Sequence, residues 1–285
     1  MRLRSQHTIR RPVSVSGVGY WSGRDNRVDL LPAPAGVGVV FLRGPGRMPS
    51  PVAAAVANRI DATQRTTLAV GSSRVEMVEH VLSALSGLGV DCCLVRVTNE
   101  ELPGLDGSAA AFVDAIDAVG LEDLIVPTDP LVLDTTVRVG DGDSWIEAGP
   151  PRHPGLSVSY ELDYGHGPIG RQSLDIDVTP ERYRDELAAA RTFIMLEEAD
   201  RLRAAGLART CGTRDLLVFG PDGPIDNALR WPDECVRHKV LDLVGDLALV
   251  GRPVHAHVRA RRSGHRLNAA LAASLLAVVG RRASA

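Results

Sequence analysis

Apolar residues recur at three- and four-residue spacing over residues 75–88, VEMVEHVLSALSGL, and this period predicts an amphipathic helix. Glu79 and His80 stand side by side at the centre of this segment. The same period predicts a second helix over residues 233–250. Its apolar side is supplied by Val240, Leu241, Val244 and Leu247.

A polar stripe runs along that second helix. His238, Asp242 and Asp246 follow one another at intervals of four residues, so their side chains lie along one face. Because the helix already has an apolar side, this stripe needs a partner of opposite character.

The order of expected elements is the same in both halves of the chain. In the first half, residues 12–43 alternate turn signals with short β-like runs, which favours antiparallel strands. The helix of 75–88 then precedes a strand at 92–98 and a helix at 109–120. The repetition predicts an α+β protein of two similar domains, each with helices on one face of its sheet. In the second half, strands are expected at 130–139, 144–149, 156–163 and 171–178, followed by helix, strand and helix at 233–250, 254–260 and 266–279.

The expected domains span residues 1–124 and 130–285, and the proline-containing segment 122–130 is the expected linker. The second domain carries an insertion at about 193–220, with a short amphipathic helix followed by an apolar run. Such an insertion is either a surface elaboration or a wall of a substrate channel. The apolar side chains that need cover there are Leu202, Leu216, Val218 and Phe219.

Composition and charge narrow the range of functions. The 285 residues carry a formal net charge of -3, so the chain lacks the broad positive field of nucleic-acid-binding proteins. Its four cysteines form no CxxC pair, which favours reduced thiols in a cytoplasmic protein. Neither a signal peptide nor an apolar run of transmembrane length is expected, so any lipid is reached from the cytosolic side through transient membrane-surface contact.

The polar stripe has two interpretations. It is either a solvated face stabilised by a His–Asp pair, or part of a metal site, because a histidine and a carboxylate four residues apart can reach one divalent ion. In the second case His80 is the candidate third ligand. Glu79 would then act as the base, as the glutamate does in HExxH enzymes, although the order here is reversed.

Two further side chains are candidates at this site. Cys235 precedes His238 by three residues and is interpreted as a small buried hydrophobe rather than a ligand. His265 stands in a turn before the last expected helix. It is either a surface or capping residue or, with Asp246 to orient it, a general acid.

Several segments together resemble one family. VEHVLSALSGLGVD, ELPGLDGSAAAFV, ARTF at 190–193, DECVRHKVLDLVGDL and SGHRLN at 263–268 occur in the order and spacing of UDP-3-O-acyl-N-acetylglucosamine deacetylases. These are zinc enzymes that commit bacteria to lipid A synthesis. The segments GVGYWSG, PAPAGVGVVF and YGHGPIGRQS also fit, so the resemblance covers nearly the full chain.

The resemblance implies two α+β domains packed as a β-α-α-β sandwich, with the site between them. It implies an acylated nucleotide-sugar substrate whose N-acetyl group is hydrolysed to acetate. It also implies roles for individual residues: zinc on His80, His238 and Asp242; Glu79 as general base; His265 as acid, oriented by Asp246; Thr192 at the oxyanion; and Phe193 and Lys239 at the substrate.

The chain departs from the family pattern in several segments. ARTF is followed by Ile194-Met195 rather than by Gly-Phe. Trp21 stands where the family has the histidine of GLHSG, and Cys92 stands where the family has the asparagine of GIDN. Thr210 and Cys211 stand where the family has a pair of glycines. Two alternatives therefore stay open: a paralogous zinc amidase for a different N-acetylated sugar, and a non-catalytic protein that binds a sugar nucleotide or an acyl chain. The acyl length, the oligomeric state and the choice between zinc and iron also stay open.

Overall fold

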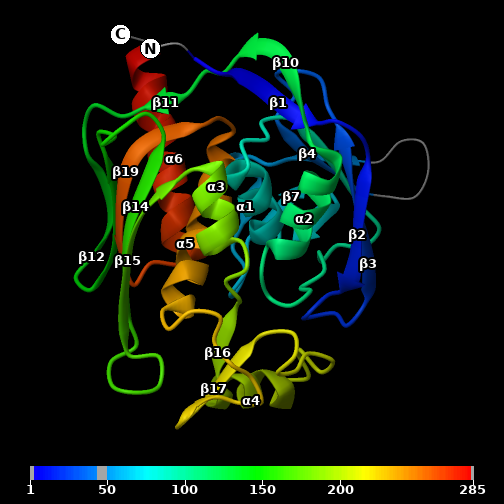
Figure 1. The fold of residues 1–285 in the computed structure, drawn as a ribbon, viewed down its shortest axis with the longest axis vertical. Helices are drawn as coiled ribbons and strands as arrows, with labels where there is room; N and C mark the ends of the chain where they lie inside the picture. The colour runs from blue at the N-terminus through cyan, green and yellow to red at the C-terminus, as the bar shows by residue number, and fades with distance from the viewer. Residues whose placement is uncertain (1–2, 44–49, 284–285) are drawn as a thin grey trace.

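Two β-sheets face each other across a double layer of helices in the computed structural model, which describes residues 3–43 and 50–283 (Figure 1). The first sheet has the order β2-β3-β9-β4-β5 and the second the order β12-β13-β19-β14-β15. The strands of the first sheet are β2 (Val13–Val18), β3 (Asp25–Pro32), β4 (Val39–Arg43), β5 (Ser50–Ala53) and β9 (Cys93–Val97). Those of the second are β12 (Val137–Asp141), β13 (Ser144–Gly149), β14 (Leu156–Asp163), β15 (Arg171–Val178) and β19 (Val254–Arg261), with β11 (Leu131–Val132) also on β19.

The two sheets share one topology. In each, the last strand along the chain takes the middle place, antiparallel to the second strand and parallel to the third. Thus β9 lies between β3 and β4 as β19 lies between β13 and β14. This agreement confirms the predicted α+β class and the β-α-α-β arrangement of two similar units.

The helices fill the space between the sheets (Figure 1). In each half one helix precedes the middle strand and one follows it: α1 (Glu79–Gly87) and α2 (Ala110–Val119) around β9, and α5 (Glu234–Leu247) and α6 (His265–Ala283) around β19. Alternate side chains of β19 are buried beneath these helices, as the two-residue period of a strand requires. Short helical segments occur at α3 (Pro180–Arg182), Val56–Asn58, Tyr183–Leu187 and Ala248–Val250.

The first expected helix is shorter than its apolar period indicates. Residues Ser73–Glu76 form strand β8, which pairs with β7 (Thr67–Val70), and α1 begins only at Glu79. Met77 lies between the two elements with a φ of 58°, which breaks the helical path. The prediction that Glu79 and His80 occupy the middle of a helix is therefore wrong, because both lie in its first turn.

The expected linker at 122–130 is in part a strand. Residues Leu121–Pro127 form β10, which pairs antiparallel with β1 (Ser5–Ile9). The pairing satisfies backbone groups that a free connection would leave to solvent.

The insertion forms a small unit of its own beside the layers. It contains β16 (Phe193–Met195), α4 (Leu196–Ala204), β17 (Leu217–Gly220) and β18 (Gly223–Pro224) and lies at the lower end of the view in Figure 1. Strand β6 (Arg59–Ile60) completes a further small sheet with β7 and β8. Among the helices that the structure describes, none combines the length and the apolar character needed to cross a bilayer.

Candidate metal centre and active site

Helices α1 and α5 cross closely at the centre of the molecule, and this crossing places the first two functional side chains. Gly245 of α5 lies against the backbone of Glu79, and a Cβ atom at position 245 would stand 2.1 Å from the carbonyl oxygen of Glu79. Glycine is therefore required for the approach. The crossing brings the first turn of α1 beside the polar stripe of α5.

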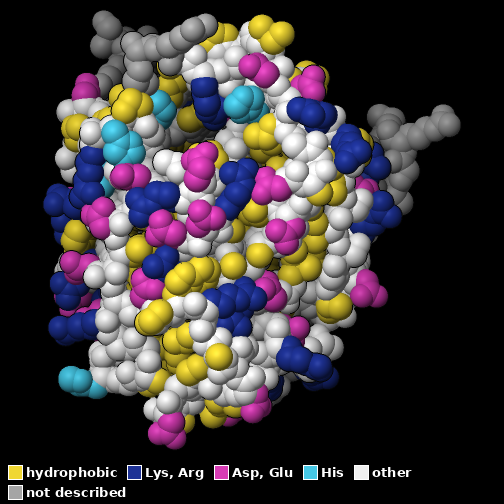
Figure 2. Space-filling view, viewed as in Figure 1, with side chains coloured by type: hydrophobic (Ala, Val, Ile, Leu, Met, Phe, Trp, Pro, Cys, Tyr) yellow, Lys and Arg dark blue, Asp and Glu magenta, His cyan; other side chains and the backbone are white. Residues whose placement is uncertain are grey.

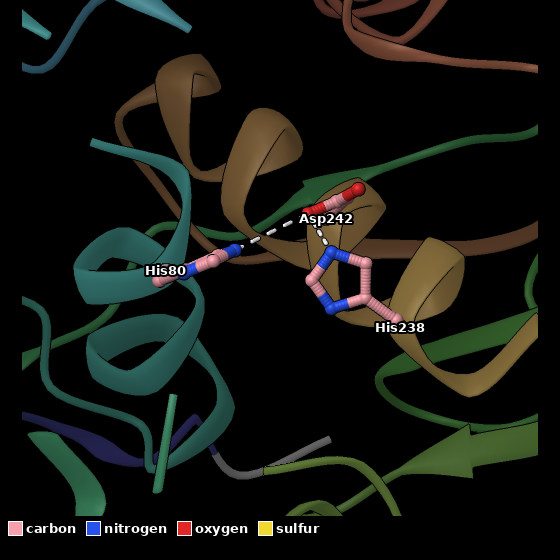
Figure 3. A group of neighbouring side chains, drawn as sticks. All are labelled: His80, His238 and Asp242. Carbon is pink, nitrogen blue, oxygen red and sulfur yellow. Dashed lines mark ion pairs between the residues drawn. The ribbon is translucent and has the colours of Figure 1, made fainter. Parts of the chain in front are cut away.

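His80, His238 and Asp242 converge from these two helices (Figure 3). One ligand atom from each lies within 4.8 Å of the other two. Asp242 Oδ1 is 3.3 Å from His238 Nε2 and 3.8 Å from His80 Nε2. All three side chains are buried. The structure thus brings together the three residues predicted as metal ligands.

Neighbouring groups orient this set. The Nδ1 atom of His238 lies 3.0 Å from the carbonyl oxygen of Ala190, which fixes the tautomer that leaves Nε2 free as an acceptor. Lys239 donates from Nζ to Asp242 Oδ2 at 2.9 Å and leaves Oδ1 facing the histidines. The ligand atoms of His238 and Asp242 are therefore turned toward the common point.

The charge states of the three groups suit a cation. Burial lowers the pKa of His238 to about 4 and also lowers the pKa of His80, so both imidazoles are neutral near pH 7. Burial opposes the ionisation of Asp242, but His238 and Lys239 hold the pKa of its carboxyl below the usual range. Two neutral imidazoles and one carboxylate form a common ligand set for a catalytic divalent metal.

The distances also fit a metal. Bonds of about 2.0–2.2 Å in a tetrahedral arrangement place neighbouring ligand atoms about 3.3–3.5 Å apart. The His238–Asp242 distance of 3.3 Å meets this value and the His80–Asp242 distance of 3.8 Å lies close to it. The residues present therefore fit a bound divalent ion with small adjustments.

Glu79 and His265 face each other beside the ligand set. Glu79 Oε1 lies 3.9 Å from His265 Nε2, and Asp246 Oδ2 lies 2.9 Å from His265 Nδ1. The imidazole is thus held on one side by Asp246 and turned with its other nitrogen toward Glu79. His265 begins α6 rather than lying in a free turn.

The pKa values of Glu79 and His265 are both raised above their ordinary values. Burial raises the pKa of Glu79 to about 7. Burial opposes protonation of His265, but the charges of Asp246, Asp242 and Glu79 together raise the pKa of its imidazole to about 9. A carboxylate that can accept a proton and an imidazolium that can donate one therefore coexist near pH 8.

Two residues that the sequence did not single out support the pair. The Thr66 backbone N–H donates to Glu79 Oε2 at 3.0 Å, and its hydroxyl donates to Asp246 Oδ1 at 2.5 Å. Asn268 donates from Nδ2 to Asp246 Oδ2 at 2.9 Å. Asn268 could have been found, since it follows His265 by one helical turn. No pattern in the sequence marks Thr66.

Thr192 lies directly over the ligand set. Its Oγ1 is 3.1 Å from His238 Nε2 and 3.0 Å from the carbonyl oxygen of Gly107. The preceding residue, Arg191, forms a buried ion pair of 2.8 Å with Glu234 at the start of α5. This ion pair, also missed at the sequence level, anchors the segment that carries Thr192.

A cavity of about 240 Å³ connects this site with the insertion. The side chains of Glu79, His80, Thr192, Phe193, His238, Lys239, Asp242 and His265 all line it. On the other side, Leu202, Leu216 and Val218 line it as well, whereas Phe219 is buried behind Phe193. Figure 2 shows hydrophobic side chains among Lys and Arg over the part of this face where Figure 1 places the insertion.

A His-His-Asp set beside a buried glutamate and a cationic histidine is the arrangement of a metal-dependent hydrolase. A family model described as UDP-3-O-acyl N-acetylglycosamine deacetylase matches residues 6–277. Curated proteins named UDP-3-O-acyl-N-acetylglucosamine deacetylase from Brucella ovis, Brucella canis and Brucella melitensis are each 42% identical over 274 residues, which is 95% of this chain and of the relative. The chain belongs to this deacetylase family.

Proposed function

We propose that the protein is an amide hydrolase that removes the N-acetyl group of UDP-3-O-acyl-N-acetylglucosamine and releases acetate, the committed step of lipid A synthesis. Family membership over residues 6–277 supports the reaction and the substrate. The observation that carries the proposal is the single cavity that joins the His-His-Asp set and Glu79 to the apolar side chains of the insertion. One cavity can thereby hold the acetamide and the acyl chain of one molecule.

His80, His238 and Asp242 would hold the metal, which we propose to be zinc. Nitrogen and carboxylate ligands in a set of three are typical of catalytic zinc. When bound, the ion would make water more acidic and polarise the acetamide carbonyl. The buried, pre-oriented ligands support this assignment.

Glu79 serves as the general base in this proposal. Its carboxylate accepts a proton from the attacking water while the water oxygen bonds to the acetamide carbon. The hydrogen bond from the Thr66 backbone holds Oε2 and leaves Oε1 toward the cavity and His265. A pKa of about 7 suits a base that must both take up and release a proton.

His265 serves as the general acid. The C–N bond breaks as the imidazolium gives its Nε2 proton to the departing nitrogen, so the sugar leaves as an amine and the acetyl group as acetate. Asp246 holds Nδ1 and stabilises the charged imidazole before the transfer.

Thr192 and two neighbouring residues complete the proposed substrate contacts. The Thr192 hydroxyl, which donates to the carbonyl oxygen of Gly107 in this structure, would turn to donate to the negative charge that develops on the carbonyl oxygen of the substrate. Phe193 and Lys239 line the same cavity, with Nζ of Lys239 5.5 Å from the centre of the Phe193 ring. An apolar ring beside a cation suits a sugar that carries a diphosphate.

We also propose that residues 1–124 and 130–285 are the two domains and that the enzyme works in the cytoplasm. The repeated sheet topology supports the division. All four cysteines are free, as expected of a protein in a reducing compartment.

The experiment that tests the function is acetate release from UDP-N-acetylglucosamine with and without its 3-O-acyl chain. Each buried methylene contributes up to about 0.8 kcal/mol, so removal of the acyl chain should lower kcat/KM on the order of 10³-fold. Equal rates on both compounds would contradict the assignment and favour an amidase for another N-acetylated sugar. Binding of both compounds without acetate release would indicate a non-catalytic protein.

A further inference from the structure

Three of the departures from the family pattern lie in the lining of the cavity or directly beside it in sequence. Trp21 and Cys211 both line it, and Thr210 directly precedes Cys211. Trp21 belongs to the turn between β2 and β3 in the first half, whereas Thr210 and Cys211 belong to the insertion in the second. The departures are therefore far apart in sequence and close together in space.

The turn that carries Trp21 is held firmly. The backbone N–H groups of Trp21 and Ser22 donate to the two carboxylate oxygens of Glu101, each at 2.7 Å. The guanidinium of Arg65 lies 4.6 Å from the centre of the indole ring, and Arg65 is itself paired with Glu76 at 2.8 Å. An aromatic side chain fixed from the backbone and from one face makes a rigid surface.

This turn touches the insertion directly. The Tyr20 hydroxyl donates to the backbone oxygen of Asp215, and it also lies 3.1 Å from the backbone oxygen of Gly104. A Cβ atom built on Gly23 would stand 3.0 Å from Thr210 Oγ1. The two segments therefore meet, and each contributes one of these side chains to the cavity, Trp21 from the turn and Cys211 from the insertion.

We propose that Trp21 and Cys211, brought together by this contact, form the end wall of the acyl-binding part of the cavity and set the maximum length of the 3-O-acyl chain. The inference rests on the proposed function. A glycine at position 211 would leave space in the cavity beside the Trp21 indole, whereas the Cys211 thiol occupies it. Because packed interiors give way little, a chain that reaches the wall has to bend or stop there.

A series of UDP-3-O-acyl-N-acetylglucosamines with acyl chains of about four to about sixteen carbons tests the wall. For the unaltered protein, kcat/KM should rise up to about fourfold per added methylene. At one chain length it should stop rising or fall, and we call this length the break. In the double variant Thr210→Gly/Cys211→Gly, and separately in Trp21→His, this break should move to longer chains. Trp21→Phe retains an aromatic ring and should keep the break close to its original length.

Cys92→Ala is the matched control, because it likewise removes a free thiol but lies outside this cavity. It should leave the break where it is. Thermal unfolding of each variant shows whether it is folded, and the two independent wall variants ensure that one unfolded protein does not end the test. A rise without any break, or a break at the same length in folded wall variants, overturns the inference. Absence of acetate release at every chain length overturns the proposed function instead.

Discussion

Glu79 and His265 are the residues on which the proposed chemistry depends most. Glu79 is buried, the His265 side chain is 13% exposed, and their atoms Oε1 and Nε2 stand 3.9 Å apart. Their environments shift the two pKa values upward, for Glu79 by burial and for His265 by the carboxylates around it, against the opposing effect of burial. The same surroundings thus prepare one group to accept a proton and the other to donate one.

Replacement of Glu79 by glutamine should lower kcat on the order of 10²-fold or more, because the amide cannot take a proton from water. Steady-state acetate release measures the change. Glu122→Gln removes an exposed carboxylate on β10 and is the control, with a rate near that of the unaltered protein. Turnover of the Glu79→Gln variant at the control rate would remove Glu79 from the mechanism.

The pH–rate profile should be bell-shaped. Glu79 must be ionised, so the rate rises with pH through its pKa of about 7; His265 must be protonated, so the rate falls above about 9. A bound dication would move both limbs to lower pH. His265→Ala should abolish the basic limb, and an unchanged basic limb in that variant would exclude His265 as the acid.

The crossing of α1 and α5 decides the geometry at the level of elements. Gly245 permits the approach, Glu79 begins α1 where the positive end of the helix dipole favours a carboxylate, and the stripe of α5 faces the same point. Ser83 reinforces the contact by donating to the backbone oxygen of Leu241 at 2.7 Å. Two helices from different halves thereby act as one support.

Gly245→Ala should push the two helices apart, because the added methyl would lie 2.1 Å from a backbone oxygen that cannot rotate away. Overpacking of this kind costs about 1–3 kcal/mol, so the free energy of unfolding should fall by that amount and metal affinity should fall with it. Denaturant unfolding and metal titration measure the two effects. Gly264→Ala is the control, since a methyl there meets nothing within 4 Å. Equal stability of the two variants would show that the crossing tolerates a side chain.

At the scale of the whole molecule, the metal site joins the two halves. His80 comes from the first half, and His238 and Asp242 come from the second. A bound ion would therefore add a cross-link between the halves to the packed helices and hydrogen bonds that already join them.

Removal of the metal should lower the thermal stability of the whole molecule. An ion present at about a thousandfold excess over its dissociation constant adds about 4 kcal/mol, which corresponds to a fall in Tm on the order of 10 °C when a chelator is added. Calorimetry with elemental analysis measures the shift and identifies the ion as zinc or iron. The double variant His80→Ala/His238→Ala should bind no metal and show no shift with chelator. Retention of the metal by that variant would place the site elsewhere.

The amino-acid sequence by itself determined where most helices and strands form and which reactive side chains they carry. The spacing of apolar residues located α5, α6 and β19, and the four-residue interval of His238, Asp242 and Asp246 put their side chains on one face. These features are local, because helix and strand periods are properties of a short stretch of chain. The matched order of elements in the halves likewise predicted the repeated sheet.

Tertiary structure alone decided where α1 begins and what surrounds the reactive groups. The apolar period of 75–88 begins four residues before the helix itself. Only the pairing of β8 with β7 and the turn at Met77 place Glu79 in the first turn of α1. The contacts of Thr66 with Glu79 and Asp246, and of Tyr20 with Asp215, join segments up to 195 positions apart. Such hydrogen bonds depend on how packed elements approach one another, and no local period encodes that approach.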